Sequence, residues 1–306
     1  MTKVIFMGTP EISVKVLEAI CSFNNVQLLM VITQPDKQVD RKNTIVYSPI
    51  KKYCLDNNLK LIQPIKISDA YEEIKNANPD IIITCAYGQF IPQKILDLPE
   101  MGCFNLHASL LPKLRGGAPI HWSIINGETK TGVTLMKMIL QMDAGDIISQ
   151  KECIIDQNET TKSLTIKLAD LAAMVLKDNW QNLVTKKYKS VPQDSQDATF
   201  GYNISKQDMI IDFNKSCHQI DCLIRGLYDK PIAVWNYQNL TIKIHEAYPT
   251  KFISQSQPGL ITKIDKTGIY VATSDFDLQI TKLQLPNKKV LTVKEIINGH
   301  HPFKIG

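Results

Sequence analysis

The sequence KVIFMGTPEISVKVLEAICS, residues 3–22, places a continuous apolar run directly before a segment of helical periodicity. The run at residues 3–8 shows no alternation of polar and apolar residues, which is typical of a strand buried on both faces. From residue 11 onward the apolar residues return near helical spacing. Pro10 stands at the start of this helix, a position that favours proline. This stretch therefore predicts one strand-helix unit of an α/β fold.

The same alternation continues through the first half of the chain. Further strands are expected at residues 28–33, 61–63, 79–88 and 102–109, with helical patterns between them. Repeated strand-helix units predict a Rossmann-like, mostly parallel sheet with helices on both faces. In such sheets ligands bind beyond the carboxyl ends of the strands, where Tyr87 and His107 are expected. Catalytic or binding residues are therefore expected at this edge of the sheet.

The second half of the chain has a different character. A long helix is expected at residues 160–184, and a polar stretch rich in turn formers follows it. Short strand-like runs with turns between them then predict a small antiparallel barrel or sandwich. These shifts divide the chain into a first domain at 1–189, a linker at 190–207 and a second domain at 208–306.

Composition narrows the class of protein. The chain has 306 residues, 44% hydrophobic and 21% charged, with a formal net charge of +5. These values are ordinary for a globular protein, and the mild positive charge is compatible with an anionic partner without establishing one. The seven cysteines form no CxxC pair, so neither a disulfide framework nor a structural zinc site is expected. With no signal peptide and no apolar run of membrane-spanning length, we expect a cytoplasmic protein without a membrane partner.

The segment FNLHASLLPKLRGGAPI, residues 104–120, carries the candidate chemistry. Alternation along a strand puts Asn105 and His107 on one face, and Asp143 lies in a glycine-containing turn after a later strand. An amide, an imidazole and a carboxylate can stabilise an oxyanion and relay a proton. The alternative is a hydrogen-bonded core histidine with a turn aspartate, and spacing alone does not separate the two. No GxGxxG fingerprint, P-loop or GxSxG motif is present.

Several segments resemble the folate-dependent formyltransferases in the same order. Besides residues 104–120, these are FMGTPEISVKVLEAI, TQPDK, INGETKTGVTLMKM, MDAGDI and the tail from KLQLPNKK to IINGHHPF. The resemblance covers nearly the whole chain. It implies transfer of a formyl group from 10-formyltetrahydrofolate, as co-substrate, to an amine, with no metal. It also implies that the second domain is an OB-like β-barrel.

The resemblance further implies roles for individual residues. Asn105, His107 and Asp143 would form the catalytic trio, with Asn105 and His107 donating to the oxyanion and Asp143 supporting the charged imidazole. The folate site would be formed by Tyr87, Gly88, Gln89, Ser109, Leu110, Leu111 and Pro112.

Within this family, the chain most resembles the member whose acceptor is the α-amino group of methionyl initiator tRNA. The long basic loop at residues 34–52 would then contact the acceptor stem through Arg41 and Lys42. Gln38, Val39 and Asp40 stand where Pro-Ala-Gly is common in the family. Two alternatives are a formyltransferase for another amine, such as glycinamide ribonucleotide or an amino sugar nucleotide, and a tRNA-binding protein without catalysis. A monomer is expected.

Overall fold

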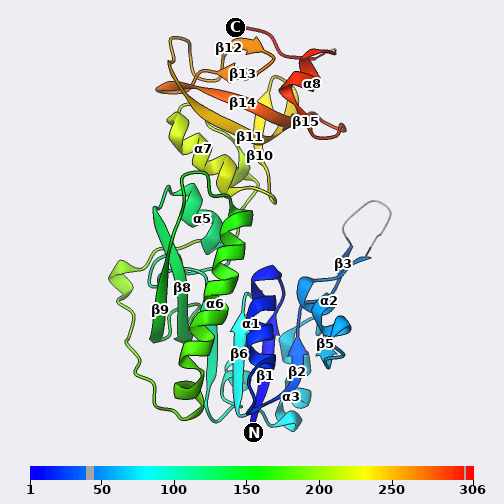
Figure 1. Cartoon of the computed structure of the whole chain (residues 1–306), viewed down its shortest axis with the longest axis vertical. Helices are drawn as coiled ribbons and strands as arrows, with labels where there is room; N and C mark the ends of the chain where they lie inside the picture. The colour runs from blue at the N-terminus through cyan, green and yellow to red at the C-terminus, as the bar shows by residue number, and fades with distance from the viewer. Residues whose placement is uncertain (39–44, 300) are drawn as a thin grey trace. The chain divides into compact units, whose positions relative to one another are not determined.

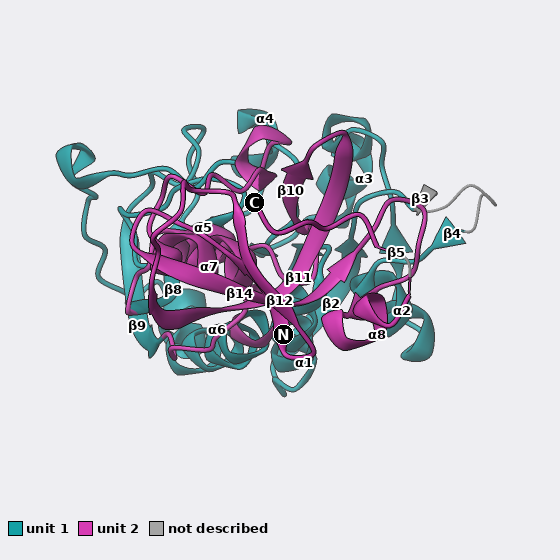
Figure 2. Ribbon diagram, turned by 90° about the horizontal axis from the view of Figure 1, so that it is seen from above, with its two compact units in different colours: residues 1–119, 130–154, 165–202 teal, residues 120–129, 155–164, 203–306 magenta. Residues whose placement is uncertain are grey.

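The computed structural model describes residues 1–38, 45–299 and 301–306. The chain forms two compact units, coloured separately in Figure 2. Unit 1 comprises Met1–Pro119, Lys130–Ile154 and Thr165–Tyr202, and unit 2 comprises Ile120–Thr129, Ile155–Leu164 and Asn203–Gly306. Arg41 and Lys42, expected to contact tRNA, lie outside the described residues. Among the helices of the described residues, none has the length and apolar character needed to span a membrane.

Unit 1 is built on a seven-stranded sheet with the order β5-β2-β1-β6-β7-β8-β9 (Figure 1). Its strands are β1 (Thr2–Gly8), β2 (Val26–Ile32), β5 (Leu61–Ile62), β6 (Ile81–Cys85), β7 (Cys103–His107), β8 (Lys130–Lys137) and β9 (Ile147–Ile154). The five strands from β5 to β7 are parallel, β8 pairs antiparallel with β7, and β9 pairs antiparallel with β8. The predicted mostly parallel α/β sheet is confirmed.

Helices cover both faces of this sheet. They are α1 (Glu11–Cys21), α2 (Pro49–Asp56), α3 (Tyr71–Ala77), α4 (Gln93–Leu96) and α6 (Thr161–Val184). On one face, Ile5 and Met7 of β1 share a buried cluster with Ile74 of α3 and Ile95 of α4. The intervening side chains of β1 are equally buried and point to the other face, over which α1 runs (Figure 1). The unbroken apolar character of residues 3–8 follows from this two-sided burial.

Gly8 lets the chain turn from β1 into α1. A Cβ at this position would lie 2.7 Å from Ser13 Cβ and 2.8 Å from Phe6 Cε1. Both distances are shorter than the contacts that Cβ atoms make in proteins. The single glycine at the end of the strand is thus explained by packing, and no dinucleotide fingerprint accompanies it.

Unit 2 is an antiparallel β domain with the strand order β10-β11-β14-β13-β12, and β15 pairs with β14. Its elements are α7 (Cys217–Gly226), β10 (Ala233–Tyr237), β11 (Leu240–Ile253), β12 (Ile261–Asp265), β13 (Gly268–Val271), β14 (Phe276–Gln284), β15 (Leu291–Thr292) and α8 (Val293–Ile297). All of α5 (Pro119–Ile125) after its first residue also belongs to this unit. An antiparallel second domain agrees with the fold class that the sequence predicts.

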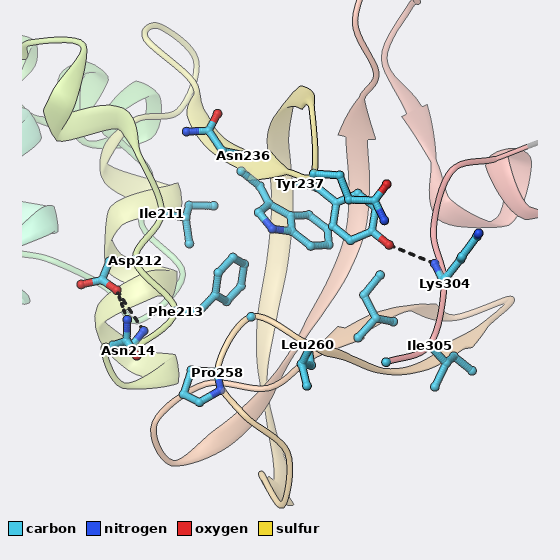
Figure 3. A pocket seen from close by; sticks show the side chains of 15 residues that line it. Ile211, Asp212, Phe213, Asn214, Asn236, Tyr237, Pro258, Leu260, Lys304 and Ile305 are labelled. Atoms are coloured by element: carbon cyan, nitrogen blue, oxygen red, sulfur yellow. Dashed lines mark hydrogen bonds between the residues drawn. The ribbon is translucent and has the colours of Figure 1, made fainter.

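The C-terminal residues bridge the two outer strands of this sheet. The backbone N–H of Lys304 donates to Tyr237 Oη of β10 (3.1 Å), and that of Gly306 donates to the carbonyl of Ile261 in β12 (3.0 Å). Phe303 is 4% exposed and stacks on Trp235 with ring centroids 6.0 Å apart. Beside this tail lies a pocket of about 580 Å³ (Figure 3), and none of the side chains predicted for catalysis or folate binding lines it.

Several of the shortest elements were not predicted, although the two-residue β5 lies within the strand expected at residues 61–63. The missed elements are β3 (Lys37–Gln38) and β4 (Ile45–Val46), which pair antiparallel, and β15 with α8 in unit 2. Two residues are too few to show any periodicity, and the residues of β3, β4 and β15 gave no other strand signal.

Candidate active site

The amide of Asn105 is oriented by the neighbouring strand. Thr84 of β6 is paired with Asn105 of β7, and its hydroxyl donates to Asn105 Oδ1 (2.8 Å). With the oxygen engaged in this way, the NH₂ group forms no hydrogen bond to any other residue that the structure describes. Asn105 therefore presents a donor at the carboxyl end of the parallel sheet.

His107, the last residue of β7, is 6% exposed. Its Nε2 lies 2.9 Å from the carbonyl oxygen of Leu114. Because a carbonyl only accepts, Nε2 carries a hydrogen in this arrangement. The other ring nitrogen, Nδ1, faces Asp143 Oδ1 at 3.6 Å. The structure thus brings together the imidazole and the carboxylate that the sequence placed in different segments.

Asp143 is held in a left-handed backbone conformation, with φ of +50°. Its Oδ2 accepts a hydrogen bond from the backbone N–H of Gly116 (2.9 Å). Gly116 has φ of +116°, and a Cβ there would lie 2.9 Å from the carbonyl oxygen of Gly201. The loop after β7 therefore needs a glycine at this position, and the N–H of that glycine orients the carboxylate.

The loop after β6 contains the first group of expected folate residues. The carbonyl oxygen of Tyr87 accepts from Thr9 Oγ1 (2.9 Å) and Gln34 Nε2 (3.0 Å). Gly88 has φ of +83°, and a Cβ there would lie 2.3 Å from Gln34 Nε2. The carboxamide of Gln89 is occupied by the backbone of residues 64–67. Gly88 itself is exposed, so its backbone is accessible to a ligand.

The side chain of Tyr87 points into the core. It is 4% exposed and packs in the cluster that contains α3 and α4. Its hydroxyl oxygen is buried without a hydrogen-bond partner among the described residues. Burial raises the pKa of this hydroxyl to about 12, since the ionised form loses its hydration.

The second group of expected folate residues is Ser109 to Pro112. The hydroxyl of Thr134 donates to the Ser109 carbonyl (2.6 Å) and accepts from the Leu111 N–H (3.1 Å). Gln150 Nε2 donates to the Leu111 carbonyl (2.8 Å). Within this stretch, Leu110 and Pro112 stay partly exposed, whereas Ser109 and Leu111 are buried. Thr134 and Gln150 were missed in the sequence, where each is simply a polar residue in a strand.

Residues 199–201 are fastened to the loop that follows His107. Arg115 N–H donates to the Thr199 carbonyl (2.9 Å), and Gly201 N–H donates to the Arg115 carbonyl (2.7 Å). Thr199 Oγ1 also accepts from Leu114 N–H (2.9 Å), the residue whose carbonyl contacts His107. Polar composition suggested a linker here, but these residues pack against the candidate site.

A separate cluster on α7 offers possible metal ligands. His218, Asp221 and Cys222 place one ligand atom each within 4.8 Å of one another. Arg225 occupies the same cluster, with Nε donating to Asp221 Oδ2 (2.8 Å) and Nη2 lying 3.3 Å from Cys222 Sγ. A guanidinium so close to two of the three ligands opposes the binding of a cation. We assign no metal to this cluster.

A donor amide, an imidazole and a carboxylate thus lie at the carboxyl end of the parallel sheet, an arrangement that can stabilise an oxyanion and relay a proton. Residues 2–179 match the formyl transferase family, and residues 203–301 match the formyl transferase C-terminal domain. The chain belongs to the formyl transferase family, and the resemblance noted in the sequence is confirmed.

Relatives match the chain over nearly its full length. It is 48% identical over 300 residues to the methionyl-tRNA formyltransferase of Ureaplasma urealyticum serovar 10, covering 98% of both chains. It is 40% identical over 302 residues to the methionyl-tRNA formyltransferase of Enterococcus faecalis, covering 98% of this chain and 96% of that one. A similar fold occurs in the N-formyltransferase from Helicobacter canadensis solved with folinic acid and dTDP-3-aminofucose. That match has a TM-score of 0.69 and 22% identity, and it covers 92% of this chain and 99% of that one.

Proposed function

We propose that this chain transfers a formyl group from 10-formyltetrahydrofolate to the α-amino group of methionyl initiator tRNA. The observation that carries the proposal is the approach of His107 Nδ1 to Asp143 Oδ1, 3.6 Å apart, beside the donor amide of Asn105. The names of the relatives support the choice of methionyl-tRNA as acceptor.

Asn105, His107 and Asp143 each have a separate role in the proposed reaction. Attack of the amine on the formyl carbon gives a tetrahedral intermediate with negative charge on oxygen. Asn105 Nδ2 donates to this oxygen, and one such donor is typically worth about 3 kcal/mol of barrier. When His107 is protonated it adds a second donor through Nδ1–H, because Nε2–H is held by the Leu114 carbonyl, and the nearby carboxylate of Asp143 stabilises that imidazolium. Asp143 also takes the proton released by the attacking nitrogen. It then passes this proton to the folate nitrogen, which leaves as its bond to the formyl carbon breaks.

The residues near Gly88 fit a folate co-substrate. Gly88 is exposed and has no side chain, so its backbone is open to contact by a pterin. Leu110 and Pro112 offer partly exposed apolar surface on the neighbouring loop. We propose Tyr87, Gly88 and Gln89 as contacts through their backbone, together with the stretch from Ser109 to Pro112.

For the tRNA, we propose contacts from Arg41 and Lys42 with the acceptor stem and further contacts from the domain at residues 208–306. Phosphates attract lysine and arginine, so binding should weaken as salt rises.

A transfer assay tests the function directly. The protein is mixed with 10-formyltetrahydrofolate and methionyl initiator tRNA, and formyl-methionyl-tRNA is measured against methionyl elongator tRNA. Fast and selective formylation of the initiator species is expected. Formylation of glycinamide ribonucleotide or an amino sugar nucleotide instead would reject the acceptor. Binding of tRNA without any transfer would reject the enzyme.

A further inference from the structure

The carboxamide of Gln193 joins two loops of the candidate site, the loop that follows β7 and the loop that contains Asp143. Gln193 Oε1 accepts hydrogen bonds from Arg115 Nε (3.0 Å) and Arg115 Nη2 (2.8 Å). Gln193 Nε2 donates to the carbonyl oxygens of Asp143 (2.9 Å) and Gly145 (2.7 Å). The side chain of Gln193 thereby connects the loop after β7, which contains Arg115, to the loop after β8, which contains Asp143.

The chemistry of the partners fixes which way this carboxamide points. Guanidinium N–H groups only donate and carbonyl oxygens only accept, so a reversed amide would lose all four bonds. A glutamate at position 193 would keep the bonds to Arg115. It would also set a carboxylate oxygen against the carbonyls of Asp143 and Gly145, where a donor is needed. A methionine would fill similar space and form none of the four bonds.

Asp143 depends on this support because its backbone is strained. A non-glycine residue at φ of +50° costs about 1 kcal/mol or more, although aspartate tolerates this region better than most residues. Gln193 fixes its carbonyl, and Gly116 N–H fixes Oδ2. With both anchored, the remaining carboxylate oxygen is directed at His107 Nδ1.

Arg115 gives the connection a rigid base. Its side chain is 3% exposed, and a buried charge requires hydrogen bonds, which Gln193 supplies. Its backbone is paired with residues 199–201 through both its N–H and its carbonyl. The guanidinium therefore has little freedom to move, and neither does the carboxamide bound to it.

We propose that Gln193 and Arg115 are positioning residues for formyl transfer. They hold the Asp143 carboxylate in the orientation in which it can contact both His107 and the attacking amine. Neither residue touches the reacting atoms. The proposal rests on the proposed function and extends it to residues outside the catalytic trio. Misplacement of a catalytic group acts on the transition state, so the loss of Gln193 should lower kcat rather than raise KM.

The decisive comparison is Gln193→Glu and Gln193→Met against Gln196→Glu, which makes the same charge change at an exposed glutamine of the same segment. We expect kcat to fall about tenfold or more in both Gln193 variants. The KM values for the formyl donor and the tRNA should stay within about twofold of the parent. Gln196→Glu should match the parent throughout. Since Gln193→Met adds no charge, it gives the answer if Gln193→Glu does not fold.

Amide hydrogen exchange at Gly116 provides a readout that needs no activity. In the parent this N–H is protected by Asp143, so its exchange should accelerate about tenfold when the Asp143 loop is released, corresponding to about 1.4 kcal/mol. A parent enzyme that formylates no methionyl-tRNA would reject the proposed function while leaving this measurement intact. Unchanged kcat, or unchanged Gly116 exchange, in folded Gln193→Met would overturn the positioning role. So would an effect on KM alone.

Discussion

Thr134 of β8 is paired with His107 of β7, and its hydroxyl holds the backbone of the loop that follows His107. One residue thus supports both the end of the catalytic strand and the stretch proposed to contact folate. Its side chain is fully buried, so the hydrogen bonds have no water to replace them.

Replacing Thr134 with valine should therefore be costly. The change keeps the shape of the side chain but leaves the Ser109 carbonyl and the Leu111 N–H without their partner. We expect the free energy of unfolding to fall by about 1–3 kcal/mol in urea titrations, together with a higher KM for the formyl donor. Thr185→Val, at an exposed threonine in the turn directly after α6, is the control and should change stability by less than about 0.5 kcal/mol. Equal stability of the two variants would contradict the role given to Thr134.

Asp143→Asn isolates the charge of the carboxylate. An asparagine oxygen can still accept from Gly116 N–H, so the fold should be retained, with unfolding midpoints close to the parent. The kcat for formyl transfer should fall about a hundredfold. The imidazolium of His107 loses the negative charge beside it, and the proton of the amine loses its acceptor. Asp146→Asn, three residues further on, should retain parental kcat. If single-turnover rates of Asp143→Asn equal those of the parent, Asp143 has no part in proton transfer.

Tyr87→Phe removes a buried hydroxyl that has no partner among the described residues. We expect the free energy of unfolding at neutral pH to rise by about 1 kcal/mol. Tyr237→Phe should instead lower it, because Tyr237 accepts a hydrogen bond from Lys304. The KM for the formyl donor should not change in Tyr87→Phe if the contact is made by the backbone. A raised KM would show that the hydroxyl itself binds folate.

The same tyrosine predicts a loss of stability in alkali. The folded-state pKa is raised to about 12 from its ordinary value near 10, so the unfolded chain releases this proton first. Stability from this group is complete below pH 10 and is lost as the pH rises from 10 to 12. The slope approaches about 1.4 kcal/mol per pH unit. In unfolding titrations across this window, Tyr87→Phe should lack this component of the slope.

Arg41→Ala tests the proposed contact with the acceptor stem of the tRNA. A guanidinium binds phosphates in a forked geometry, and loss of that contact should lower kcat/KM for methionyl initiator tRNA about tenfold, or about 1.4 kcal/mol. Arg41→Lys should restore part of it, and the KM for the formyl donor should stay unchanged. If Arg41→Ala has the kinetics of the parent at both low and moderate salt, the tRNA is bound by other residues.

Patterns in the sequence were sufficient for the long elements. The unbroken apolar run predicted the strand at residues 3–8, and helical periodicity predicted the helix at residues 160–184; both lie where expected. The side-by-side placement of Asn105 and His107 follows from strand alternation alone. Their convergence with Asp143 came from family resemblance, because no local rule relates a turn after β8 to the end of β7.

Gln193 shows what local patterns leave out. Its neighbours in the chain are polar and include proline, so composition indicated a linker. Its four hydrogen bonds all reach residues far away in the sequence, in loops whose relation depends on the finished sheet. Thr134 and Gln150 are similar cases, since a polar residue in a strand does not reveal which loop it will hold.

The tail at residues 303–306 has a consequence for behaviour in solution. The strands β10 and β12 are the outer strands of the unit 2 sheet, and outer strands expose unpaired N–H and C=O groups that can recruit strands from other molecules. The tail occupies part of this backbone through Ile261 and covers Trp235 with Phe303. A change that displaces the tail would free this backbone for pairing with another molecule, and we expect it to appear as aggregation before any loss of catalytic activity.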